Sequence, residues 1–295
     1  MTAATLSGAA VRSDGVLWQL ARLEIRRYLR HPLYLLGLLV LLLSVAGMVS
    51  ASSTDQSPLS APIAPAFLMG VFGVVVAAQL TASAARVGRS AGAVPVSERT
   101  RTLALAVAFA VPALTVAVWL VVFLVVYRVH PPLAGVWWFG TLSTGHVISM
   151  LMGTTVVSAF GGPALGMLTA RWVRWRPAPL VVAVLLVVAC MLTQTSDAFP
   201  RRVALLAPWT AWSAGVTDGR AVYYAGSPQW WLVYAVALCV LTVVAVVYRD
   251  RDADRGRLRT IAVVVVVVAL AALTLAGTTG AHDTRYLPAS VSASS

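Results

Sequence analysis

The side chains that most often carry out catalysis are few in this sequence and are scattered along it. Ser143 and His146 lie three residues apart in TLSTGH, a spacing that places both on one face of a helix. A serine nucleophile of the G-x-S-x-G type needs a glycine two residues earlier, where this chain has Thr141. The four histidines stand singly, and Cys190 and Cys239 fall inside apolar runs. We therefore expect no catalytic, cofactor-binding or metal-binding residues in this chain.

The basic residues also restrict nucleotide chemistry. All 22 are arginine, because the sequence contains no lysine. A Walker A phosphate loop requires its lysine, and Schiff-base catalysis requires one as well. The chain is therefore expected to bind no nucleotide, and any ATP and Mg²⁺ that power it must bind to a separate subunit.

The acidic residues provide a third exclusion. Ion-coupled transporters usually bury carboxylates within their spans as proton or sodium relays. None of the ten acidic residues lies in a long apolar run; they are Asp14, Glu24, Asp55, Glu98, Asp197, Asp218, Asp250, Asp252, Asp254 and Asp283. An ion-coupled secondary transporter is therefore the least favoured kind of transporter.

The elements that must position any functional side chain are apolar helices. The chain is 59% hydrophobic and 11% charged, with a mean hydropathy of +0.85. About twenty helical residues cross the 30 Å hydrocarbon core of a bilayer, and lipid-exposed backbone must be helical to satisfy its hydrogen bonds. We predict an all-α polytopic membrane protein with spans at 33–51, 62–84, 103–127, 142–170, 178–194, 230–248 and 261–277. In a six-span alternative, the last run is a re-entrant or interfacial element.

The distribution of arginine predicts the orientation. With the N-terminus in the cytoplasm, 17 of the 22 arginines fall in cytoplasmic segments, as the positive-inside rule requires. The C-terminal tail then lies outside the plasma membrane of a bacterium. The formal net charge of +12 favours contact with anionic membrane lipid, and we expect no nucleic-acid partner.

A basic segment precedes the first span. Placed on a helix, residues 16–30 gather Arg22, Arg26 and Arg30 with Gln19 on one stripe. The opposite arc is apolar and consists of Leu17, Trp18, Ala21, Ile25, Tyr28 and Leu29. Pro32 ends this helix because proline is not tolerated inside one. The pattern predicts an amphipathic elbow helix in the headgroup plane that couples a cytoplasmic partner to the first span, or a simple topological anchor.

Three segments resemble the permease subunits of type-2 ABC exporters, especially actinobacterial members. These are ARLEIRRYLRHPLYLLG (21–37), GRSAGAVPVSERTRTLALAVA (88–108) and SPQWWLVYAVALCVLTVVAVVYRDRDADR (227–255). The resemblance implies a cytoplasmic segment with an elbow helix (1–32), a six-span core (33–248) and a charged cytoplasmic loop (249–259). A further helix and extracellular tail (260–295) depart from the family pattern. The resemblance also implies two partners, a separate ATPase subunit and a second permease copy.

The cytoplasmic loop 85–102 is the main candidate for contact with that ATPase. Ser97 is a suitable N-cap, and Glu98 then falls in the first helical turn, where negative charge is favoured. The resemblance implies that this loop and the elbow helix form the coupling surface, with Arg22, Arg26, Arg30, Arg89, Pro95, Ser97, Glu98 and Arg99 near the contact. The alternative is an ordinary capped turn with cytoplasmic arginines.

A few polar and helix-perturbing residues lie within or beside the spans. Gln79, Ser83, Thr154, Ser158, Thr193 and Gln194 either make hydrogen bonds between helices or form a weakly polar lining for an apolar substrate. Gly161, Gly162 and Pro163 predict close packing, or a kink that serves as a gate. The outer segment 195–229 contains Pro208 within RVALLAPWTAWSAG, which the resemblance implies is a re-entrant helix at the outer gate.

These features together favour a permease subunit of an ATP-driven exporter that moves an apolar or amphipathic drug-, antibiotic- or lipid-like substrate outward. The first alternative is a membrane component without transport activity, such as a scaffold, assembly or immunity protein. The second is the ion-coupled transporter.

Overall fold

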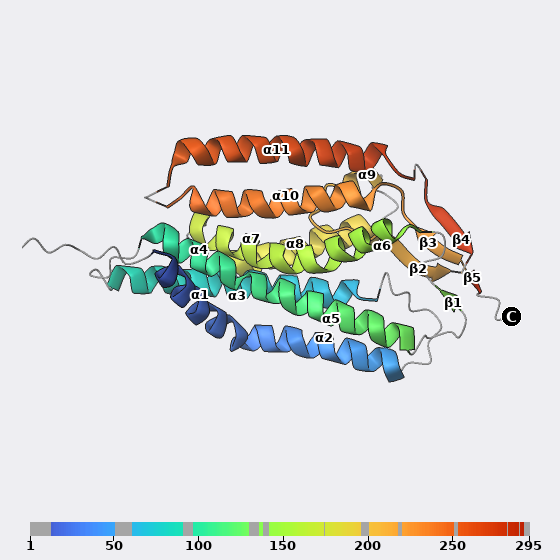
Figure 1. Ribbon diagram of the computed structural model, residues 1–295, viewed down its shortest axis with the longest axis horizontal. Helices are drawn as coiled ribbons and strands as arrows, with labels where there is room; N and C mark the ends of the chain where they lie inside the picture. The colour runs from blue at the N-terminus through green and yellow to red at the C-terminus, as the bar shows by residue number, and fades with distance from the viewer. Residues whose placement is uncertain are drawn as a thin grey trace, which may run out of the picture.

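The computed structural model describes residues 13–50, 61–90, 97–129, 136–137, 142–173, 175–195, 201–217, 220–250, 253–281, 283–288 and 290–291. Long helices run side by side through most of its length (Figure 1). The helices are α1 (Ser13–Leu29), α2 (Pro32–Ser50), α3 (Ile63–Ser90), α4 (Glu98–Ala108), α5 (Ala110–Val129), α6 (Thr144–Leu151), the π-helix η1 (Met152–Val157), α7 (Ser158–Trp172), α8 (Ala178–Thr195), α9 (Arg201–Ala204), α10 (Pro228–Val247) and α11 (Arg255–Thr278).

Each of the seven apolar runs forms a helix, and most are long and apolar enough to cross a bilayer. Within the described residues, five helical stretches meet that condition: α3, α4 with α5, α6 to α7, α10 and α11. A sixth is added if the bent pair α1–α2 is one span, and the described apolar part of α8 is shorter. The structure therefore confirms several long apolar helices, as expected for a polytopic membrane protein.

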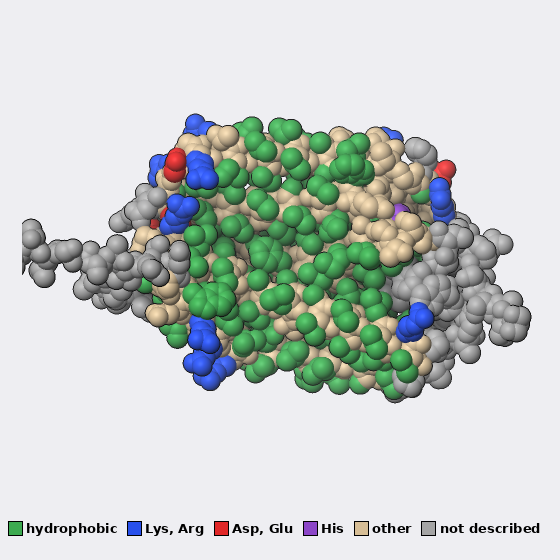
Figure 2. Space-filling model, viewed as in Figure 1, with side chains coloured by type: hydrophobic (Ala, Val, Ile, Leu, Met, Phe, Trp, Pro, Cys, Tyr) green, Lys and Arg blue, Asp and Glu red, His purple; other side chains and the backbone are tan. Residues whose placement is uncertain are grey.

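Charge and apolar surface are separated along the helices. In Figure 2 hydrophobic side chains cover the middle of the molecule, whereas arginines gather at its two ends. Large side chains such as Leu114, Val118, Leu185 and Val267 are more than half exposed, as lipid-facing residues are. The described parts of the N- and C-terminal regions lie at opposite ends of the bundle (Figure 1).

The packing centre is the crossing of α3 and α7. At Gly162 and Gly166 of α7, an added Cβ would overlap the backbone of Gly70 and Val74 in α3. The absence of side chains therefore allows the two backbones to touch, as small residues do between transmembrane helices. The packing explanation for the glycine-rich segment thus holds for Gly162.

The irregular part of this span is in a different place from the glycines for which a kink was predicted. Gly161, Gly162 and Pro163 all lie within α7, and the departure from α geometry is the π-helix η1 several residues earlier. Pro163 lacks an N–H and so leaves a carbonyl one turn before it without a helical donor. The π-helix ends before that turn, and one of its carbonyls, that of Thr154, accepts a hydrogen bond from a distant segment, as described below.

The N-terminal helices bend by 64° where α1 meets α2, next to Pro32. Tyr28 of α1 is buried at this joint, with its ring 5.4 Å from that of Tyr34 and 6.0 Å from that of Phe109. The predicted apolar arc of α1 is divided, because Ala21 and Tyr28 are buried whereas Trp18 is 59% exposed. The buried face of α1 packs on α4, not on lipid alone.

Short strands, which the all-α prediction did not include, gather at the end opposite α1 (Figure 1). In one sheet, β2 (Ser213–Thr217), β3 (Arg220–Tyr223) and β4 (Arg285–Pro288) pair antiparallel in that order. In the other, β1 (Val136–Trp137) pairs with β5 (Ser290–Val291). The chain that follows α11 therefore completes the sheet of the outer segment, a long-range pairing with no local sequence signal. Of the predicted re-entrant helix, only the single turn α9 is helical.

Candidate functional site: an apolar pocket between two charged ends

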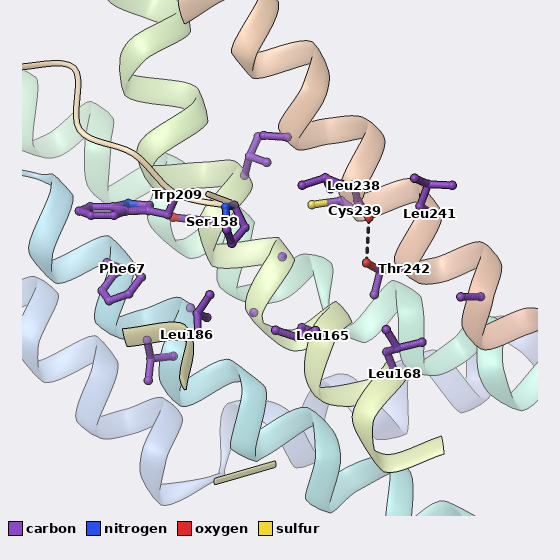
Figure 3. A pocket seen from close by; sticks show the side chains of 18 residues that line it. Phe67, Ser158, Leu165, Leu168, Leu186, Trp209, Leu238, Cys239, Leu241 and Thr242 are labelled. Atoms are coloured by element: carbon purple, nitrogen blue, oxygen red, sulfur yellow. Dashed lines mark hydrogen bonds between the residues drawn. The ribbon is translucent and has the colours of Figure 1, made fainter. Parts of the chain in front are cut away.

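A pocket of about 400 Å³ lies within the bundle, between α3, α7, α8 and α10 (Figure 3). Its floor is α7, and Leu165 and Leu168 of that helix face α10. Apolar side chains make up most of the rest; they include Phe67, Leu186, Trp209, Leu238 and Leu241. Pockets of this size and apolar character are typical of small-molecule sites.

The polar atoms in the pocket are occupied by the protein itself. Ser158 donates hydrogen bonds of 2.8 Å to the carbonyls of Thr154 and Thr155, and Thr242 donates one of 2.8 Å to the carbonyl of Leu238. Among the described residues, the lining has no arginine, histidine or carboxylate. The pocket can therefore hold an apolar group and offers nothing to neutralise a charged one.

One end of the pocket is closed by the outer segment. Trp209 stacks at 4.7 Å on Phe67, and its indole N–H donates a hydrogen bond of 3.1 Å to the carbonyl of Thr154 in η1. In a π-helix the usual i−4 pairing is lost, so its carbonyls can accept other donors. The predicted gate residue Pro208 precedes this tryptophan and also lines the pocket.

The outer segment is held by a half-buried arginine. Arg201 donates hydrogen bonds to the carbonyls of Ala225 and Ala211 at 3.1 and 2.8 Å, and to the Thr210 hydroxyl at 2.9 Å. Its guanidinium lies 4.7 Å from the ring centre of Trp212. Burial lowers the pKa of Arg201 to about 10, still high enough to keep it charged at neutral pH. Arg201 thus fixes the turn that presents Trp209.

The opposite end of the bundle contains an ionic cluster. Asp250, just beyond α10, is fully buried and accepts hydrogen bonds from Arg171 of α7 and, at 3.0 Å, from Thr102 of α4. Arg171 also donates to the Thr102 hydroxyl at 2.6 Å and lies 3.6 Å from the Glu98 carboxylate. Burial raises the pKa of Asp250, and Arg171 and Thr102 partly oppose that shift. The cluster joins α4, α7 and α10 at the end of the bundle where α1 lies.

The described residues predicted to couple to an ATPase lie at this same end. Arg22 and Arg26 on α1 and Arg30 directly after it are exposed, and Arg99 is exposed at the start of α4. Ser97 is the N-cap of α4, as predicted, and its hydroxyl accepts the Thr100 N–H at 3.1 Å. Arg89 is in the last turn of α3 with its side chain outside the described residues, and Pro95 lies outside them altogether. The packing of α1 on α4 brings the two predicted coupling segments together.

Of the residues predicted to line a pathway, Ser158 lines the pocket. Gln79 instead lies 3.0 Å from the His31 ring beside the α1–α2 bend, and Ser83 donates to the Leu80 carbonyl at 2.8 Å. Thr154 is buried beside the pocket, with its hydroxyl bonded to the Met150 carbonyl at 2.7 Å. Thr193 and Gln194 lie in the last turn of α8, with side chains outside the described residues. Gly161 and Gly162 line the pocket as well, whereas Pro163 packs toward Gly73.

Four residues with central positions were not among the predicted site residues. Trp209 and Arg201 lie in the outer segment 195–229, where only Pro208 was singled out. Asp250 was counted among the acidic residues outside the apolar runs, and Arg171 among the cytoplasmic arginines. The signal available for the last two was their position, since each directly follows an apolar run and carries opposite charge. No family model and no curated protein sequence matches the chain.

Proposed function

We propose that this chain is the membrane-spanning permease subunit of an ATP-driven exporter of the type-2 ABC class. In this proposal a separate ATPase subunit supplies the energy, a second permease copy completes the pathway, and α1 is an interfacial elbow helix on the cytoplasmic side of a bacterial plasma membrane. The substrate is apolar or amphipathic. All seven apolar helices cross the bilayer, so the C-terminal tail lies outside.

The observation that carries this proposal is the packing of α1 against α4 at one end of the bundle. Both helices expose arginines there: Arg22 and Arg26 on α1, with Arg30 directly after it, and Arg99 on α4. A basic surface formed by two sequence-distant helices suits an acidic protein partner and, at its edge, anionic lipid. The exposed Trp18 and Leu23 on α1 suit the apolar part of the interface.

A path of contacts leads from that surface to the pocket. Thr102 of α4 is hydrogen-bonded to Arg171 and Asp250, which belong to the inner ends of α7 and α10. These two helices form the floor and one wall of the pocket. When ATP closes the ATPase dimer, a push on α1 and α4 would therefore move α7 and α10 through a buried ionic link.

The proposal predicts an ATPase reading frame beside the gene, and the test is co-purification of this chain with that ATPase carrying a tag. Replacing Arg22, Arg26 and Arg30 together with glutamine removes the basic face of α1 and should lower recovery of the ATPase about tenfold or more. Arg202→Gln is the matched control, because Arg202 is an exposed arginine at the opposite end of the bundle. Undiminished recovery with the triple variant would remove α1 from the coupling surface.

A further inference from the structure

The pocket is an elongated slot that runs along the helix axes. Its α10 wall extends from Ala235 to Ala245, eleven residues whose ends are about 15 Å apart along the helix axis. α8 packs on α3 and α7, whereas α10 packs on α7 and α11. α8 and α10 therefore flank α7, and each also packs against a different further helix. The slot lies between α8 and α10, over α7.

The size of the slot limits what can occupy it. Its volume of about 400 Å³ lies at the low end of the range for pockets that enclose small molecules. A long, narrow occupant therefore suits it. One or two strings of carbon atoms with neighbours about 4 Å away fit such a slot.

The chemistry of the slot selects an uncharged chain. Its two hydroxyls, on Ser158 and Thr242, donate to carbonyls of their own helices. A polar or charged group placed there would lose its water without gaining a partner, at a cost of several kcal/mol. Any polar head must stay outside the slot, while the apolar part enters.

The closed outer end determines the route of entry. Trp209, tied to Thr154 and stacked on Phe67, covers that end (Figure 3). The lining residues Leu168, Leu186 and Leu241 are only partly buried, so the slot is open along its side toward the apolar surface of the bundle. An apolar chain can therefore enter from the hydrocarbon of the bilayer without passing Trp209.

We propose that this slot binds the aliphatic chain of a single lipid-like molecule, which enters sideways from the membrane and is kept from the outer solution by Trp209. The inference that transported molecules bind in this slot rests on the proposed export function. The inference that the slot binds an aliphatic chain rests on the slot alone. The site lies within one subunit and needs no second copy.

Gly161 provides a way to fill the slot without disturbing the helix packing. A Cβ built on Gly161 meets only the Cys239 sulfur, at 3.4 Å, so Gly161→Leu directs its side chain into the slot. Gly47→Leu is the matched control, because Gly47 is exposed on α2 and an added Cβ meets nothing within 4 Å. Leu165→Ala changes the same slot in the opposite direction by enlarging it.

The probe is a palmitate analogue with a photoactivatable diazirine at mid-chain, added to the purified full chain in lipid nanodiscs. After illumination, peptide mass spectrometry should find the label concentrated in 157–168 and 235–245. Gly161→Leu should lower that labelling at least about fivefold, whereas Gly47→Leu and Leu165→Ala should retain it.

Label spread evenly over the lipid-facing residues, with no change in Gly161→Leu, would overturn the inference. Thermal unfolding of each variant shows whether the fold is kept; if Gly161→Leu unfolds, labelling of the enlarged Leu165→Ala slot decides, and its absence there overturns the inference. The assay contains no ATPase and no ATP. Failure of the ATPase to co-purify would therefore refute the export proposal and leave this result unaffected.

Discussion

Trp209 in the outer segment donates its indole N–H to the backbone carbonyl of Thr154, 3.1 Å away inside a π-helix. The two residues are 55 positions apart in the sequence, and both are buried. A π-helical turn within an α-helical span often marks a functional site, because it places carbonyl groups where another element can reach them. Here that element is the cover of the apolar pocket, so the irregular turn and the closed outer end are parts of one arrangement.

Loss of the Trp209 side chain should open the pocket to solvent at the end of the bundle where the strands lie. Trp209→Phe removes one hydrogen bond, worth about 1 kcal/mol, and keeps most of the ring stacking, whereas Trp209→Ala removes both. We expect Cys239 to react with a water-soluble maleimide roughly fivefold faster in Trp209→Phe and faster still in Trp209→Ala.

The control for this experiment is Trp172→Phe. Trp172 also donates its indole N–H to a helix carbonyl, that of Ala245 at 3.1 Å, but it lies at the opposite end of the bundle. Equal acceleration in Trp172→Phe and Trp209→Phe would show general loosening and contradict a cover formed by Trp209.

Removal of Arg171 alone should destabilise the protein strongly. Asp250 is fully buried, so Arg171→Met leaves an uncompensated carboxylate and should cost about 3–5 kcal/mol of folding stability. The double variant Arg171→Met with Asp250→Leu removes both charges and should recover most of that loss. Thermal unfolding in detergent measures both, and additive losses in the double variant would show that the two residues do not act as a pair.

The pH dependence of stability should carry a contribution from Asp250. Burial raises its pKa above 3.8 in the folded state, so the folded protein binds this proton more tightly than the unfolded chain. The stability due to this group is therefore gained as pH falls through the folded pKa toward 3.8 and is lost as pH rises again. Relative to Asp250→Asn, the wild-type melting temperature should rise on acidification through this window; a relative fall would reverse the assigned direction.

The two adjacent glycines of α7 should respond differently to alanine. Gly162→Ala forces a Cβ into the backbone of Gly70, so α3 and α7 must separate, at a cost of about 1–3 kcal/mol. Gly161→Ala meets only the Cys239 sulfur at 3.4 Å and should leave the unfolding temperature nearly unchanged. If both substitutions are tolerated equally, the close crossing of α3 and α7 is not a determinant of stability.

Hydropathy was sufficient to predict that the apolar runs are helical, because apolar backbone in lipid has few alternatives to a helix. Local chemistry also predicted the Ser97 cap, which depends only on residues three positions apart. The Arg171–Asp250 pair could not be predicted in this way, because its members are 79 residues apart and only the packing of α7 on α10 brings them together. The π-helix at 152–157 could not be predicted for the same reason. The donor to its Thr154 carbonyl, Trp209, comes from a distant segment.

The strands at the outer end were missed for a related reason. β4 pairs with β3 across more than sixty residues, and the two turns that permit this, at Gly226 and Gly280, have positive φ values of 113° and 96°. Glycine at these positions predicts a turn, but it does not predict which strands will pair. The pocket shares this limit: Ser158, Gly161 and Gly162 were predicted site residues, but the walls that α8 and α10 supply depend on tertiary packing.

The central claim is that this chain moves an apolar substrate with energy from another subunit. The most direct measurement is ATP-dependent transport of a lipophilic fluorescent dye in proteoliposomes that contain the chain alone or the chain with the ATPase encoded beside it. We predict no ATP hydrolysis and no ATP-dependent transport by the chain alone, and transport when the ATPase is present. Transport by the chain alone, whether driven by ATP or by a proton gradient, would contradict the account.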